Sequence, residues 1–155
     1  MILSFSKRKS VLEVEEGNSF QPKFDEHGLI PVVTVDKNNN ILMHGYMNSD
    51  ALKKSIETKS AYYWSRSRNC LWKKGETSGL TQDIIEIRVD DDQDCIWMKV
   101  NVNGNGASCH VGYKSCFYRK LSFDKNSQVK LIFTEKKKVF EPKKVYGDIP
   151  NPTKL

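Results

Sequence analysis

Two neighbouring segments, residues 83–90 and 95–102, alternate apolar with polar side chains and constrain the fold more than any other part of the chain. In the first, DIIEIRVD, the apolar residues at 85, 87 and 89 are separated by a glutamate and an arginine. In the second, CIWMKVNV, the residues at 96, 98, 100 and 102 are apolar, and lysine and asparagine lie between them. A period of two is typical of a half-buried strand, so both segments are predicted to be β-strands.

Another pair of strands is predicted before these two. Residues 31–36 (PVVTVD) are rich in β-branched side chains, and residues 41–47 (ILMHGYM) are mostly apolar. Residues 37–40 between them are a lysine and three asparagines, and asparagine tolerates the left-handed backbone of a tight turn. We therefore expect a hairpin here, and a last strand near residues 129–133.

One helix is predicted clearly. Asn48 or Ser49 can cap its first turn, Asp50 favours the positive end of the helix dipole, and the helix is expected to end near Thr58. The fold class predicted from these elements is α+β: a strand-rich single domain with a mainly antiparallel sheet and one or two short helices.

Length and composition describe a globular chain of 155 residues, of which 38% are hydrophobic and 28% charged. No run of about 18 apolar residues is present, so no membrane partner is expected. The first ten residues carry charge too early for a secretory signal peptide, which favours a cytoplasmic location.

The net charge of +6 raises the question of a nucleic-acid partner. The excess comes from residues 1–10 and 134–155, whereas positive and negative side chains balance in residues 11–133. Basic ends of this kind are usually solvated tails, so no nucleic-acid partner is predicted.

Residues 90–94 (DDDQD) contain four aspartates in five positions. On an extended chain Asp90, Asp92 and Asp94 would share one face, where their carboxylates repel one another unless a cation neutralises them. Oxygen ligands suit magnesium, calcium or manganese. An EF-hand is excluded, because Cys95 stands where its loop needs glycine and Asn101 where it needs glutamate.

The segment SCHVGYKSCFYR (residues 108–119) holds a second set of ligands, Cys109, His110 and Cys116. Four cysteines in a chain without an export signal argue against a disulfide framework. Thiolate and imidazole suit zinc, and a zinc with fewer than four protein ligands keeps a position for water. The H-x-E and P-C-x-x-C signature of the zinc deaminases is absent.

Residues 60–79 (SAYYWSRSRNCLWKKGETSG) interleave aromatic and basic side chains and end in a glycine-flanked polar run. Aromatic rings stack on bases, and guanidinium groups bind phosphate in a bidentate way. An aromatic strand with a solvated basic face gives the same pattern, so at this point both readings stay open.

Three motifs, YYWSRSRNCLWKKGETSG, the acidic run after IRV, and SCHVGYKSCFYR, stand in one order and spacing. In this the chain resembles the phosphoribosyl-AMP cyclohydrolases of histidine biosynthesis (EC 3.5.4.19), over about residues 29–121. The resemblance implies a cyclohydrolase domain at 29–133, between an N-terminal extension (1–28) and a basic C-terminal tail (134–155). With no phosphoribosyl-ATP pyrophosphatase segment, the chain looks like the monofunctional form.

The resemblance also implies the reaction and its cofactors. The family opens the adenine ring of 1-(5-phosphoribosyl)-AMP by hydrolysis between N1 and C6, and it requires zinc and magnesium. It works as a homodimer, expected here to be intertwined, with zinc at the subunit interface. By position, the magnesium ligands would be Asp90, Asp92 and Asp94, and two zinc ligands would be Cys109 and Cys116.

The third zinc ligand departs from the family pattern D-C-D-x-D, because its cysteine position is Asp91 here. We favour Asp91 as an oxygen ligand. Cys95 lies about 13 Å further along an extended chain and would need a bend. His110 is the third candidate.

His110 is expected to be catalytic, moving a proton while a zinc-activated water attacks C6. The residues expected to bind the ring and phosphoribosyl groups are Trp64, Arg66, Arg68, Gly75, Glu76, Thr77 and Ser78. The alternative is a non-catalytic, zinc-stabilised dimer that binds a nucleotide as a sensor, and only the replaced zinc ligand favours it.

Overall fold

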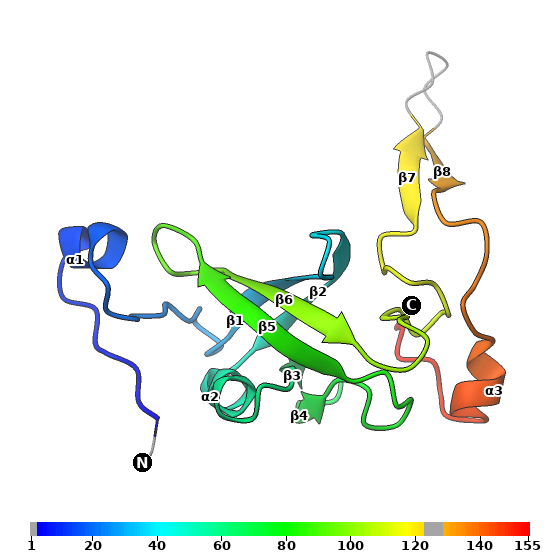
Figure 1. Cartoon of the computed structure of the whole chain (residues 1–155), viewed down its shortest axis with the longest axis horizontal. Coiled ribbons are helices and arrows are strands. Elements are labelled where there is room, and N and C mark those ends of the chain that lie inside the picture. Colours follow the sequence, from blue (N-terminus) through cyan, green and yellow to red (C-terminus); the bar gives the residue numbers. More distant parts are fainter. Residues whose placement is uncertain (1–2, 123–128) are drawn as a thin grey trace.

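A four-stranded sheet forms the centre of the molecule (Figure 1). The computed structural model describes residues 3–122 and 129–155. The strand order is β2-β1-β6-β5, with β1 and β6 parallel and the outer pairs antiparallel. The strands are β1 (Ile30–Val35), β2 (Ile41–Met47), β5 (Gln82–Val89) and β6 (Ile96–Val102). The predicted hairpin and the two alternating strands are therefore confirmed.

Helix α2 (Ser49–Thr58) and the hairpin of β3 (Tyr62–Ser65) and β4 (Cys70–Lys73) lie together against the sheet (Figure 1). The predicted cap is present, because the Asn48 side chain accepts a hydrogen bond of 2.9 Å from the backbone N–H of Ala51. The helix ends where Lys59 takes a left-handed conformation, with φ of 57°. The helix therefore begins and ends where the sequence predicted.

The core lies between the sheet and these covering elements. Its fully buried side chains include Ile30 and Val32 of β1, Met98 of β6, Leu52 of α2 and Tyr63 of β3. Each buried aliphatic side chain contributes about 1.5–3 kcal/mol to folding. On β6 the predicted period of two holds, with Ile96, Met98 and Val100 buried. On β5 the predicted face is wrong, because a bulge between Ile84 and Glu86 shifts the register and leaves Ile85 57% and Val89 37% exposed.

The described residues contain three short helices, whereas one or two were predicted. Helix α1 (Val11–Glu16) is capped by Ser10, whose hydroxyl accepts from the backbone N–H of Glu13 at 3.2 Å. Helix α3 (Pro142–Tyr146) begins with proline, which is favourable in the first turn. Both are too short to show a helical period in the sequence, which is why the prediction was wrong on their number.

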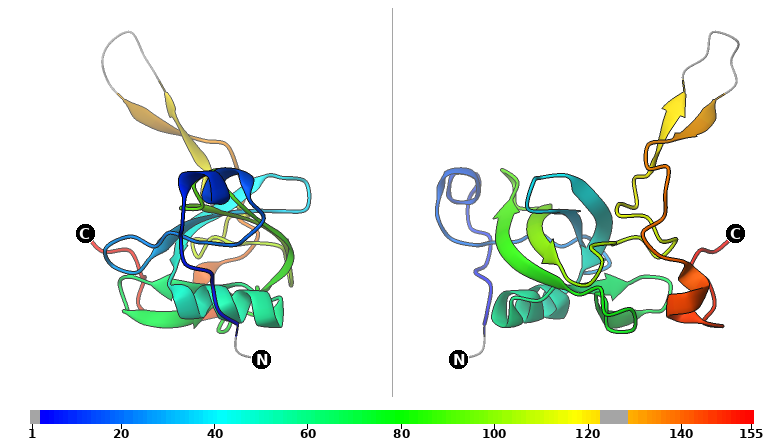
Figure 2. Two further views of the ribbon diagram at one scale, coloured as in Figure 1. Left: turned by 90° about the vertical axis from the view of Figure 1, so that its left-hand side faces the viewer. Right: turned by 45° about the vertical axis from the view of Figure 1, so that its right-hand side comes forward.

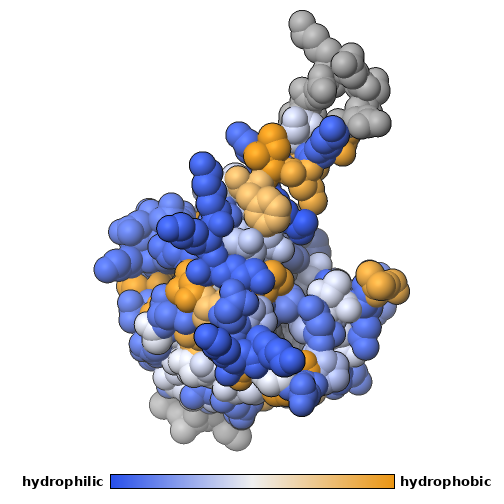
Figure 3. All heavy atoms as spheres, turned by 90° about the vertical axis from the view of Figure 1, so that its right-hand side faces the viewer, coloured by the Kyte–Doolittle hydropathy of each residue, from blue (hydrophilic) through white to orange (hydrophobic). Residues whose placement is uncertain are grey.

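Strands β7 (Arg119–Ser122) and β8 (Lys130–Phe133) form a separate antiparallel hairpin that projects from the body (Figures 1 and 2). The predicted strand near 129–133 is thus confirmed, but it pairs with β7 and not with the central sheet. Figure 3 shows orange, hydrophobic surface on the projecting hairpin. Apolar side chains on this hairpin are about half exposed. They are Leu121, Leu131, Ile132 and Phe133.

Both flanks of the central part contact it. From the N-terminal extension, Phe5, Phe20 and Phe24 pack against the core. From the C-terminal segment, Val139 donates a backbone hydrogen bond of 2.7 Å to the carbonyl of Gly112. Among the described residues, no helix is both long and apolar enough to cross a bilayer.

Candidate active site

The acidic loop, residues 90–95, connects β5 to β6 and is a turn, not the extended segment assumed above. Oδ1 of Asp90 accepts backbone hydrogen bonds from Asp94 and Cys95, both at 2.9 Å. Gln93 takes a left-handed conformation with φ of 57°. The expectation that alternation along a strand brings the aspartates together is therefore wrong, because the chain curls around the Asp90 carboxylate.

Nevertheless, Asp90, Asp92 and Asp94 converge, each offering a carboxylate oxygen within 4.8 Å of the others. Burial raises the pKa of Asp94, and the neighbouring Asp92 and Asp90 raise it further. Lys23 partly offsets this charge, with its Nζ 3.6 Å from Asp94 and 3.9 Å from Asp92. Three partly solvated carboxylates at this spacing fit a hard divalent cation that keeps some of its water, such as magnesium.

The cysteine loop, residues 108–116, follows the turn at the far end of β6. Ser108 is held from the core: its hydroxyl lies 3.2 Å from Nε2 of Gln82, whose Oε1 accepts from the Tyr63 hydroxyl at 2.7 Å. At the other end of the loop, the backbone N–H of Cys116 donates to the carbonyl of Leu42 at 2.7 Å. Hydrogen bonds to the rest of the protein therefore hold both ends of the loop without any bound ligand.

Cys109 and Cys116 are free thiols that lie next to each other. A hydrogen bond from the Cys116 thiol lowers the pKa of Cys109 to about 6, and the same bond, with burial, raises the pKa of Cys116. A thiol that is already ionised near neutral pH is a ready ligand for a soft cation. Two sulfur donors of this kind fit zinc.

His110 lies beside this pair, and its Nε2 is buried without a hydrogen-bond partner among the described residues. Burial lowers the pKa of His110, against the effect of a hydrogen bond that the imidazole donates to the Asn151 side chain in the C-terminal segment. The imidazole is therefore neutral at pH 7, with a nitrogen free to accept a proton.

Lys74 was missed by the sequence analysis. It directly follows β4 and is only 4% exposed, and among the described residues no carboxylate lies within 4 Å of its ammonium group. Burial lowers the pKa of Lys74, while Cys116 and Cys109 act in the opposite direction. A lysine buried near two thiols supplies positive charge that favours their ionised forms. No sequence signal separated it from the neighbouring Lys73.

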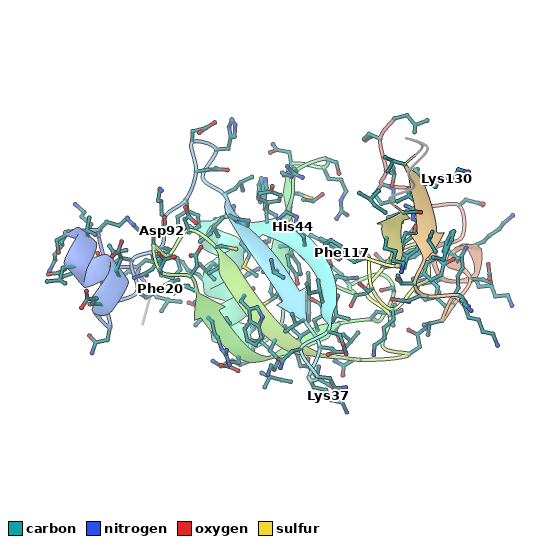
Figure 4. The ribbon with its side chains drawn as sticks, turned by 90° about the horizontal axis from the view of Figure 1, so that it is seen from above. Phe20, Lys37, His44, Asp92, Phe117 and Lys130 are labelled. Carbon is teal, nitrogen blue, oxygen red and sulfur yellow. The ribbon has the colours of Figure 1, made fainter. Side chains whose placement is uncertain are left out.

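The two loops lie at opposite ends of the β5–β6 ladder, which runs from the Val89–Ile96 pair to the Gln82–Val102 pair. At the usual rise per residue these ends are about 20 Å apart. In Figure 4, Asp92 and Phe117, the residue that follows Cys116, lie at opposite ends of the sheet. Within one chain, Asp91 and Cys95 therefore stay with the acidic loop and away from the two cysteines.

In the described part of the chain, the three aspartates are the only group of three or more acidic, cysteine or histidine side chains close enough to share one ion. Cys109 and Cys116 are thus brought together without a third donor at that spacing. Asp91 and Cys116 are both exposed on their chain.

The predicted substrate-binding residues lie on the β3–β4 hairpin and the loop that follows it. The guanidinium of Arg66 lies 4.0 Å from the centre of the Tyr46 ring. Arg68 lies over Trp72 at 5.4 Å and donates to the Ser65 hydroxyl at 3.1 Å. Trp64 is half-buried beside them. Both arginines are exposed, so their remaining donors face solvent.

The polar run after β4 is a tight loop closed by a backbone hydrogen bond of 2.8 Å from Gly79 to Gly75. Gly75 has φ of 81°, and a side chain there would overlap the backbone of Leu80 and Thr81. The loop side chains that it exposes or half exposes are Glu76, Thr77 and Ser78. Lys74 directly precedes this loop, and its charge interacts with the thiols of the cysteine loop.

Comparison with known proteins gives a consistent result. The sequence model of the family "Phosphoribosyl-AMP cyclohydrolase" matches residues 43–118. A phosphoribosyl-AMP cyclohydrolase of Rhodopseudomonas palustris is 49% identical over 136 residues, 87% of this chain and 89% of that protein. One of Sinorhizobium fredii is 46% identical over 150 residues, 96% of this chain and 98% of that protein. The chain is therefore an enzyme that belongs to the phosphoribosyl-AMP cyclohydrolase family.

Proposed function

We propose that the chain catalyses the hydrolytic opening of the adenine ring of 1-(5-phosphoribosyl)-AMP between N1 and C6, the third step of histidine biosynthesis. The named relatives support the reaction. The observation that carries it is the pair of adjacent thiols beside a buried imidazole whose Nε2 has no hydrogen-bond partner among the described residues. An orphaned polar atom next to two soft ligands is costly for folding alone, and it is explained by a reacting water or substrate.

Zinc would be held by Cys109 and Cys116, and when bound it would lower the pKa of a water molecule towards neutrality. Nε2 of the neutral His110 accepts a proton from a water molecule as the oxygen of that water adds to C6. The same nitrogen returns the proton to N1 as the N1–C6 bond breaks. C6 becomes the carbon of a carboxamide, and N1 carries the phosphoribosyl group away on a formimino arm.

The third zinc ligand comes from a second copy of the chain in this proposal. Asp91 cannot reach the cysteines of its own chain, since the loops are about 20 Å apart along the sheet. A two-fold symmetric dimer brings the acidic loop of one protomer to the cysteine loop of its partner, and does so twice. The exposed apolar side chains on β7 and β8 could be buried in the interface of such a homodimer.

Magnesium would be held by Asp90, Asp92 and Asp94, and in the dimer this site lies next to the zinc of the other protomer. Arg66 and Arg68 have solvent-facing donors that suit the two phosphates of the substrate. Trp64 and the loop of Gly75, Glu76, Thr77 and Ser78 would hold the ring and ribose.

A nucleotide sensor without turnover is the second candidate, favoured by the aspartate that replaces a cysteine in the family's zinc motif. The test is turnover of phosphoribosyl-AMP by metal-stripped protein, followed by ultraviolet absorbance, with zinc and magnesium added singly and together. Activity restored only by both metals is the expected result. Nucleotide binding by folded protein without turnover under any condition would favour the sensor.

A further inference from the structure

We propose that the N-terminal extension, residues 3–28, builds the acidic loop through Gln93 and thereby sets the divalent-cation affinity of that loop. The inference rests on the proposed magnesium site. It concerns a segment that lies outside the part of the chain matched by the family's sequence model. Gln93 and Lys23 are positioning residues here, since neither is proposed to touch substrate.

Gln93 is 5% exposed, and every polar group of its side chain is used by the extension. Its Oε1 accepts the backbone N–H of Gln21 at 2.7 Å. Its Nε2 donates to the carbonyls of Val14 at 3.0 Å and Ser19 at 3.3 Å. In this aspartate-rich loop, the single amide side chain is therefore buried against the extension, whereas the aspartate side chains are exposed or half-exposed.

The backbone of Gln93 is held as well. Its N–H donates to the carbonyl of Asp90 at 3.1 Å, and its carbonyl accepts from Lys23 at 2.8 Å. Its φ of 57° is a left-handed conformation, which is unfavourable for a residue with a side chain, and these hydrogen bonds help to hold it. Because Asp92 and Asp94 flank this residue, the same contacts set where their carboxylates point.

The extension that supplies these contacts is itself fixed to the body. Phe5 and Phe20 meet edge to face, with ring centres 5.2 Å apart, and both pack against the core. Figure 4 shows Phe20 beside Asp92 at this end of the sheet. The loop therefore rests on a packed segment rather than on a solvated tail.

Lys23 acts in the opposite direction on the same loop. Its Nζ lies 3.6 Å from Asp94 and 3.9 Å from Asp92, so the extension also brings its own cation to these carboxylates. An ammonium and a divalent ion compete for the same negative charge. Gln93 thus favours cation binding by holding the loop, and Lys23 opposes it.

The experiment is a titration of the full chain with Mn²⁺ alone, followed by electron paramagnetic resonance. Gln93→Met keeps the length of the side chain and loses its three hydrogen bonds, and we expect affinity to fall about tenfold or more. Lys23→Gln is expected to raise affinity about two- to fivefold, the size of an exposed ion pair. Asn39→Met is the matched control, because Asn39 is also left-handed, with φ of 67°, in an exposed turn.

Two further variants separate the outcomes. Asp92→Asn must weaken Mn²⁺ binding, and if it does not, the proposed magnesium site itself fails. If Asp92→Asn weakens binding while Gln93→Met stays within twofold of the native chain, the inference is wrong and the site stands. Should Gln93→Met not fold, Gln93→Gly adopts the left-handed conformation freely and decides the question with the same expected loss.

Discussion

The acidic loop and the cysteine loop sit at the two ends of the same strand, β6, and they are built in different ways. The acidic loop is braced by its own Asp90 carboxylate and by the segment that precedes the sheet. The cysteine loop is braced by the core, through Gln82, and by the segment that follows the sheet, through Glu135. One strand thus carries, at its two ends, a loop of carboxylates and a loop of thiols that are held by opposite ends of the chain.

The two loops also differ in the ligand atoms that each brings together within one chain. Three carboxylates converge within the acidic loop, so a single chain presents a set of oxygen ligands to water. The cysteine loop contributes two thiols, Cys109 buried and Cys116 exposed, beside a buried lysine and a buried imidazole nitrogen. Among the described residues, the acidic loop therefore presents three converging carboxylates, whereas the cysteine loop presents two thiols and no third donor at that spacing.

The largest expected effect comes from removing a thiol. We expect Cys109→Ser to lower zinc content to less than about a tenth and to abolish turnover, because the buried ionised ligand is lost. Mn²⁺ affinity at the acidic loop should stay within about twofold, since the loops are anchored separately. Zinc analysis and the Mn²⁺ titration check both halves, and a joint loss would show that the two loops are one unit.

A smaller effect is expected at Glu135. Its carboxylate accepts the backbone N–H groups of Lys114 at 2.8 Å and Ser115 at 2.9 Å, immediately before Cys116. Glu135→Ala should weaken zinc binding about tenfold, by loosening this anchor. Chelator competition measures the affinity. Glu141→Ala is the matched control, because its side chain makes no capping hydrogen bond at α3. Equal affinities for the two variants would contradict the account.

The smallest effect is a change in pH dependence at Lys74. Its positive charge lowers the pKa of both Cys109 and Cys116, so the thiols ionise at lower pH while it is present. In metal-free Lys74→Met, the ionisation of Cys109, which lies at about pH 6 in the native chain, should move to higher pH. Thiolate absorbance near 240 nm follows it. Lys73→Met is the control, and a midpoint that is unchanged in Lys74→Met would remove Lys74 from the site.

Local patterns in the sequence were enough to predict β1, β2, β5, β6 and α2. Their signals are a period of two, a polar turn and a helix cap, all of which act over a few residues. The convergence of Asp90, Asp92 and Asp94 was predicted for the wrong reason, since the turn at Gln93 depends on contacts with Val14, Ser19 and Gln21, more than seventy positions away. No local pattern carries that information.

The burial of a residue type that is normally solvated is the other feature that the sequence did not predict. Lysine is almost always solvated, so nothing in LWKKGETSG separated Lys74 from Lys73. The identity of the third zinc ligand depends on which loops meet between two copies of the chain. Asp91 remains a prediction, and in this proposal the ligand comes from the second copy.

The most direct measurement of the shared site is complementation between two inactive variants, Asp91→Ala and Cys109→Ser. Mixed under conditions that allow subunit exchange, half of the dimers carry one defect in each protomer, and one of their two sites is then intact. The account predicts recovery of about a quarter of native turnover in the mixture. Mixed dimers that form, as seen by native mass spectrometry, yet stay as inactive as the separate variants would contradict it.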